Sequence, residues 1–168
     1  SLYPIINRDY CRRAKNLVLI TIPPSLALLK EVLVLTAAEK LILVNNRDYS
    51  QSINDYLKNL LSLIKYSLKQ KNGIFNLEKA ALALEAEEIA VKRGLEFLQA
   101  ESVISFEYIS YQELLISRGG NKDRGKANLS SRSLKNILGE SSAFRRFIKN
   151  KSPEKIELLL NKFRDVKK

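Results

Sequence analysis

The 168-residue chain contains no histidine, no methionine and no tryptophan, and its only cysteine is Cys11. The absence of histidine excludes Ser-His-Asp triads, imidazole zinc sites and acid–base catalysis by imidazole. One cysteine cannot form an internal disulfide or a thiolate metal cage, which favours a reducing intracellular compartment. We therefore expect a cytoplasmic chain with no metal ion, no cofactor and no catalytic residue of its own.

The carboxylates are the remaining candidates for catalysis. Three of them, Glu85, Glu87 and Glu88, cluster at the predicted start of a helix, where the helix dipole favours negative charge. A solvated structural role explains this cluster better than a pair of catalytic acids does.

Long apolar runs are also missing. No stretch approaches the roughly 20 residues of a membrane-spanning helix, and no signal peptide is visible. A hydrophobic content of 45% suits a soluble chain with one core or two small fused subdomains. The chain begins Ser1-Leu2-Tyr3, so we expect a piece excised from a longer polypeptide, although processing can also remove an initiator methionine.

The net charge of +11 is distributed unevenly. Residues 1–116 contain 14 Lys or Arg against 13 Asp or Glu, whereas residues 117–168 contain 15 against 5. Such an excess in one region is typical of a surface that binds a polyanion. The alternative is a basic surface that only keeps the chain soluble or faces an acidic neighbouring domain.

Residues 73–110 change from helical to strand periodicity. Apolar residues recur at helical spacing over 77–84 and again over 89–98, and they alternate over 103–109. This pattern predicts a helix-turn-helix followed by a hairpin that turns near Ser110, as in a winged helix. A plain helical hairpin is the alternative.

The second helix of this motif is not basic. Between residues 87 and 100 it carries three glutamates against Lys92 and Arg93, which opposes approach to phosphates. We therefore expect the motif to be structural or protein-binding rather than a reader of duplex DNA.

The preceding segments alternate between strand and helix. Residues 16–22 and 40–44 are predicted as buried strands joined by a helix over 25–38, which gives a right-handed parallel β-α-β unit. The turn after the first strand contains two prolines and no glycine, so we expect no nucleotide site there. A helix over 51–71, capped by Asp48 or Ser50 and ending at Asn72-Gly73, follows as the first helix of the winged helix.

The last third combines a loop with helices. Residues 118–132 are rich in glycine, serine and basic residues, which predicts a flexible loop able to follow a single-strand backbone. Short helices are expected at 133–138 and 141–149, with Phe144 and Phe147 in the core, and a last helix begins at Ser152-Pro153-Glu154. The candidate DNA-binding residues are the cations of this region: Arg118, Lys122, Arg124, Lys126, Arg132, Arg145, Arg146 and Lys149.

The predicted fold class is α/β (α+β). We expect a β-α-β unit at 1–46, a winged-helix-like subdomain at 47–117, and a basic loop with C-terminal helices at 118–168, all in one compact domain. The successive sequence segments are LVLITIPPSLALLKEVL, KLILV, RDYSQSINDYL, LEKAALALEAEEIAVKRGLEFLQAESVI, SLKNILGESSAFRRF and SPEKIELLL.

Over most of residues 16–160, these segments resemble the C-terminal domain of bacterial RecJ, the single-strand-specific DNA exonuclease. The resemblance implies a non-catalytic accessory domain for DNA repair and recombination, because the family's aspartate and histidine metal motifs belong to a nuclease core elsewhere in the parent chain. The implied partners are single-stranded DNA, that nuclease core, and single-strand-binding protein or other repair proteins. A docking domain without DNA binding and a winged-helix regulator of duplex DNA remain as alternatives.

Overall fold

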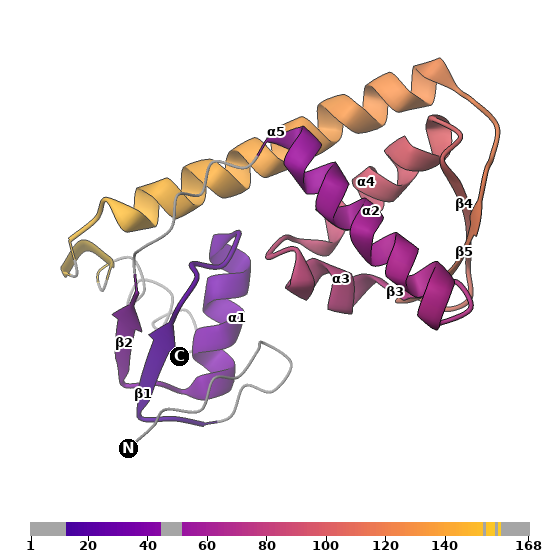
Figure 1. Cartoon of the computed structure of the whole chain (residues 1–168). Helices are drawn as coiled ribbons and strands as arrows, with labels where there is room; N and C mark the ends of the chain where they lie inside the picture. The colour runs from indigo at the N-terminus through magenta and orange to yellow at the C-terminus, as the bar shows by residue number, and fades with distance from the viewer. Residues whose placement is uncertain (1–12, 45–51, 153, 157, 159–168) are drawn as a thin grey trace. The chain divides into compact units, whose positions relative to one another are not determined.

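The structure is a computed structural model that describes residues 13–44, 52–152, 154–156 and 158. It mixes helices and strands in two sheets, so the predicted α+β class is confirmed (Figure 1). The chain divides into unit 1, residues 1–49 and 141–168, and unit 2, residues 50–140. Residues 118–168, expected as one segment, are thus shared between the two units. Within the described ranges, no helix is both long and apolar enough to cross a membrane.

Unit 2 has the element order and sheet topology of a winged helix. Its elements are α2 (Ile53–Gln70), β3 (Ile74–Asn76), α3 (Leu77–Ala83), α4 (Glu88–Ala100), β4 (Ile104–Tyr108), β5 (Glu113–Arg118) and residues 124–140 of α5 (Arg124–Lys149). The strands form an antiparallel sheet in the order β3-β5-β4. The predicted helix-turn-helix and hairpin are therefore confirmed, whereas β3 was not predicted.

Local capping explains where α2 begins and ends. Ser52 is its N-cap, and its hydroxyl oxygen accepts a hydrogen bond from the Asp55 amide at 3.1 Å. The cap residues predicted at positions 48 and 50 lie outside the described residues. At the other end, Asn72 and Gly73 have positive φ values of 50° and 82°, as the predicted Asn-Gly stop requires.

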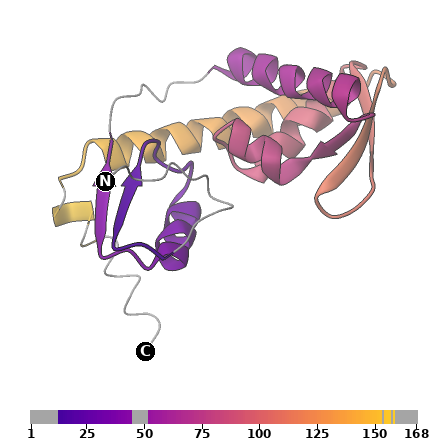
Figure 2. The same cartoon turned by 60° about the horizontal axis from the view of Figure 1, so that its bottom comes forward.

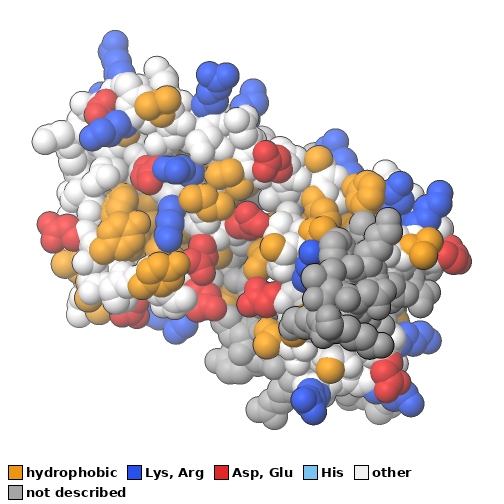
Figure 3. Space-filling model, turned by 180° about the vertical axis from the view of Figure 1, so that it is seen from behind, with side chains coloured by type: hydrophobic (Ala, Val, Ile, Leu, Met, Phe, Trp, Pro, Cys, Tyr) orange, Lys and Arg blue, Asp and Glu red, His pale blue; other side chains and the backbone are white. Residues whose placement is uncertain are grey.

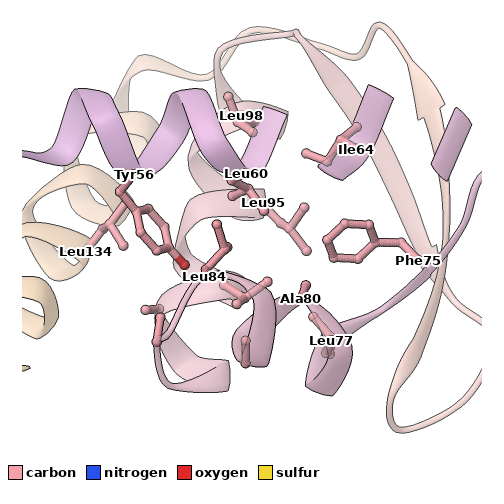
Figure 4. Close-up of a cluster of buried hydrophobic side chains, with 14 of the residues drawn as sticks. Tyr56, Leu60, Ile64, Phe75, Leu77, Ala80, Leu84, Leu95, Leu98 and Leu134 are labelled. Carbon is pink, nitrogen blue, oxygen red and sulfur yellow. The ribbon is translucent and has the colours of Figure 1, made fainter. Parts of the chain in front are cut away.

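The core of unit 2 lies between α2, α3, α4 and the sheet (Figure 4). Leu95 and Leu98 of α4 are buried against α2, as their helical spacing predicts. Gly94 permits this close approach, because a Cβ atom there would lie 2.5 Å from Cδ2 of Leu60. Leu134 and Leu138 of α5 complete the same cluster.

The predicted loop at 118–132 is wrong, because α5 already begins at Arg124 and continues without a break through both short helices expected after it. Asp123 caps its start by accepting a hydrogen bond from the Lys126 amide at 3.0 Å. Ala127 and Ser130 begin the buried stripe that Leu134 continues at helical spacing. Since these first two residues are small or polar, the sequence shows no apolar period there.

Unit 1 contains the predicted parallel β-α-β arrangement. Strands β1 (Asn16–Leu19) and β2 (Lys40–Leu43) pair in parallel, and α1 (Leu26–Thr36) connects them. Both strands are shorter than expected, and the prediction that they are buried is wrong, because only Leu17 in them is buried.

A hydrophobic cluster in unit 1 joins the end of α5 to the segment after β1. Ile148 and Ile156 are buried together with Ile22, and Phe144 packs against them, as expected for a core residue. Phe147, however, remains 45% exposed, with Nζ of Lys151 at 4.6 Å from the centre of its ring. The prediction that Phe147 belongs to the core is therefore wrong.

Candidate nucleic-acid interface

The candidate cations nearest to the hairpin lie where β5 leads into α5. Arg118 ends β5, Lys122 lies in the connecting loop and Arg124 begins α5, and all three are exposed. Nζ of Lys122 lies 3.3 Å from a carboxylate oxygen of Glu101, just after α4. These residues therefore gather at one end of unit 2.

Hydrogen bonds hold the connecting loop against the end of α4. The Asp123 amide donates to the Ala100 carbonyl at 2.8 Å, and the Ser102 hydroxyl donates to the Gly120 carbonyl at 2.7 Å. Gly119 and Gly120 have φ values of 89° and 147°, which favour glycine at both positions. The backbone that carries the cations is thus tied to the winged-helix core.

Other cations lie on the exposed side of α5. At about 100° per residue, Arg124, Arg132 and Lys135 fall within about 80° of one another, with Arg124 next to the buried stripe and Arg132 farther from it. All three are exposed, and the one acidic residue of α5, Glu140, lies outside this arc, about 80° beyond Arg132. Lys135 was not among the predicted residues, although its spacing of three residues from Arg132 places both on one side of a helix.

Lys126 differs from these residues. Its Nζ lies 3.6 Å from a carboxylate oxygen of Asp123, and its position on the helical wheel is away from Arg124 and Arg132. The hydrogen bond from the Lys126 amide is the main cause that lowers the pKa of Asp123. Asp123 therefore carries a negative charge beside Lys126 at neutral pH.

The last three candidate residues, Arg145, Arg146 and Lys149, belong to unit 1. The prediction that Arg145 is a DNA-binding cation is wrong. Arg145 is only 8% exposed, and its Nε donates a hydrogen bond to the Ile22 carbonyl at 2.8 Å. Its guanidinium holds the fold of unit 1 together, so it is not a surface cation. Arg146 and Lys149 are exposed in the last turns of α5.

Both cations of α4 have a partner nearby. Nη1 of Arg93 lies 2.7 Å from a carboxylate oxygen of Glu96, so these two charges offset each other. Lys92 makes a different contact, because its Nζ lies 5.2 Å from the centre of the Tyr111 ring. These contacts do not change the net charge of residues 87–100, where three glutamates still stand against Lys92 and Arg93.

The tip of the hairpin carries exposed aromatic rings that sequence analysis missed. Tyr108 is 57% exposed and Tyr111 is 80% exposed, with the exposed Ile109 between them. The signal in the sequence was three aromatic residues within six positions, 106 to 111. On the molecular face drawn in Figure 3, hydrophobic side chains reach the surface beside side chains of both charges.

Neither a metal cluster nor a known relative defines the site. Within the part of the chain that the structure describes, no three Asp, Glu or Cys side chains gather as a metal site. Comparison of the chain with family models, curated proteins and solved structures gives no match. The function of the chain must therefore be inferred from the surface of each unit.

Proposed function

We propose that this chain is a non-catalytic accessory domain of a single-strand-specific DNA exonuclease, and that it contacts single-stranded DNA through unit 2. The resemblance to the RecJ C-terminal domain supports the exonuclease context. The observation that carries the proposal is the exposed side of α5, where Arg124, Arg132 and Lys135 fall within about 80° of one another and no acidic residue of α5 falls within that arc.

Phosphate contact is the chemistry that these side chains provide. Exposed lysine and arginine side chains release counterions when they neutralise phosphates, and this contribution does not depend on base sequence. Because three of the cations are on a helix rather than on a flexible loop, less conformational entropy is lost when they bind. Arg118 adds an exposed cation at the end of β5, and Lys122 adds one whose charge is partly offset by Glu101.

A salt titration tests the proposal. Binding of single-stranded oligonucleotides of two different sequences is measured by fluorescence anisotropy from low to moderate salt. Arg124→Ala/Arg132→Ala should weaken binding of both sequences about equally and lower the salt slope by roughly one to two units. The matched control is Lys58→Ala/Lys65→Ala on α2, which removes the same charge from exposed positions and should change the slope less.

Two other results would contradict the proposal. If Lys92→Ala/Arg93→Ala on α4 is more damaging than the α5 pair, the winged helix itself is the DNA reader. If the chain binds no DNA with a steep salt dependence, docking of a protein partner becomes the better function. The exposed apolar side chains Val34 and Leu35 of α1 favour that second candidate.

A further inference from the structure

The tip of the β4–β5 hairpin is a hydrogen-bonded turn. The amides of Ile109 and Ser110 donate hydrogen bonds to the Glu113 carbonyl at 2.9 and 3.1 Å, and the Ser110 hydroxyl oxygen accepts one from the Glu113 amide at 3.2 Å. Figure 2 shows the hairpin in salmon beside the helices of unit 2, and its tip comes close to Lys92 of α4. Tyr111 is thus held in an exposed position by a defined backbone.

Two exposed rings at this tip are each positioned by a neighbour. Tyr108 contacts the ring of Phe106 edge to face, with the ring centres 6.0 Å apart at 81°. Phe106 in turn packs against the core of unit 2. Tyr111 has the ammonium group of Lys92 at 5.2 Å from its ring centre, in the range of a cation–π interaction.

We propose that Tyr108 and Tyr111, with Lys92, form a stacking platform for unpaired nucleobases. This inference rests on the proposed function and adds base contacts to its phosphate contacts. Aromatic rings beside cations bind single strands because every base has a face on which a ring can stack. Duplex DNA does not offer these faces, since its bases stack on one another, so the platform selects single strands.

The platform and the basic end of the hairpin are separated along β5. Glu113 follows the turn and Arg118 ends the strand, so the two ends lie about 17 Å apart at about 3.3 Å per residue. One strand that contacts both therefore runs along the hairpin, with bases at the tip and phosphates at Arg118 and Lys122.

The absence of tryptophan allows a direct test, because Tyr111→Trp places a single indole at the platform. Its emission should be quenched when the chain binds oligothymidylate, and it should stay unchanged with an abasic oligonucleotide of equal length and charge. Tyr66→Trp on α2 is the matched control. Tyr66 is 56% exposed and has the Lys71 ammonium 5.9 Å from its ring, and we expect no quenching there. Equal quenching of both reporters overturns the platform.

A second variant tests the energetic role of the rings. The wild-type chain should prefer oligothymidylate over the abasic strand by about tenfold for each stacked base. Tyr108→Leu/Tyr111→Leu should abolish this preference and leave the salt slope unchanged. Both side chains are more exposed than buried, so the fold should tolerate the change, and circular dichroism checks this.

The outcomes separate this inference from the proposed function. Equal wild-type affinity for both strands, with a steep salt slope, overturns the platform and supports the phosphate contacts. A base preference that survives in the double leucine variant also overturns the platform. No salt-dependent binding of either strand overturns both proposals.

Discussion

Tyr56 is the most unusual residue of the core. Its side chain is fully buried among the apolar side chains of unit 2 (Figure 4). Its hydroxyl has no hydrogen-bond partner among the described residues. Burial raises the pKa of Tyr56, because the phenolate would lose its hydration in the core. The ring therefore stabilises the fold by apolar packing, while the hydroxyl opposes it.

Tyr56→Phe should raise the free energy of unfolding by about 1 kcal/mol at neutral pH, because it removes a buried hydroxyl that lacks a partner. The pH dependence follows from the raised pKa. Above about pH 10 the unfolded tyrosine loses its proton while the folded one keeps it, so the wild-type chain loses stability as pH rises. The variant should lose less stability between pH 8 and pH 11 in urea melts. Identical pH profiles would contradict this account.

Truncation of Leu95 tests how much the core of unit 2 contributes to stability. Leu95 is fully buried in the cluster that α2 and α4 share, so Leu95→Ala should lower the free energy of unfolding by roughly 2 to 5 kcal/mol. A denaturant melt measures the change. Leu129→Ala on α5 is the control, since Leu129 is 72% exposed, and its effect should be below about 0.5 kcal/mol.

At the scale of elements, Gly94 of α4 and Gly139 of α5 differ in whether the packing around the helix leaves room for a side chain. Gly94 lies where α2 crosses α4, and Gly139 lies on the exposed side of α5 with no atom within 4 Å of an added Cβ. Both glycines lower helix propensity by about 1 kcal/mol relative to alanine. Only Gly94 is required by packing.

Gly139→Ala should therefore raise the free energy of unfolding by about 0.5 to 1 kcal/mol, since helix propensity is its only effect. Gly94→Ala gains the same propensity but forces a methyl group into Leu60, and overpacking costs about 1 to 3 kcal/mol. Thermal melts of the two variants should differ in this order. A stability loss in Gly139→Ala would show that α5 is not continuous at residue 139.

At the scale of the whole molecule, unit 2 is continuous in sequence and unit 1 is not. Unit 2 keeps its core when the chain is cut after residue 140, because Leu134 and Leu138 of α5 are retained. Unit 1 needs both ends of the chain, since Ile22 packs with Ile148 and Ile156. The two units therefore differ in how they respond to truncation.

A fragment of residues 50–140 should fold alone and unfold cooperatively in a calorimetric melt. A shorter fragment of residues 50–122 should not, because it lacks Ala127, Leu134 and Leu138, whose burial completes the core. Equal melts of the two fragments would show that α5 contributes little to unit 2.

The whole chain should show no nuclease activity of its own. It has no histidine for a metal motif, and we expect no degradation of single-stranded DNA with magnesium or manganese. Degradation that disappears when one of the chain's own carboxylates is replaced would refute this prediction.

The sequence by itself determined the elements whose signals are local. Helical spacing and the Asn72-Gly73 stop defined α2, and the change of period at about residue 103 defined the helix-turn-helix and its hairpin. Periodicity is sufficient there because each element has a clear apolar side and a clear end signal.

Only the tertiary structure decided the features that depend on distant contacts. The first part of α5, residues 124–132, was missed because the first positions of its buried stripe are Ala127 and Ser130, whose burial depends on tertiary packing. Arg145 was taken for a surface cation because its partner, the Ile22 carbonyl, is 123 residues away in the sequence. The meeting of Lys92 with Tyr111 likewise required the hairpin to fold back onto α4. Charge and ring type are visible in a sequence, but their neighbours are set by packing.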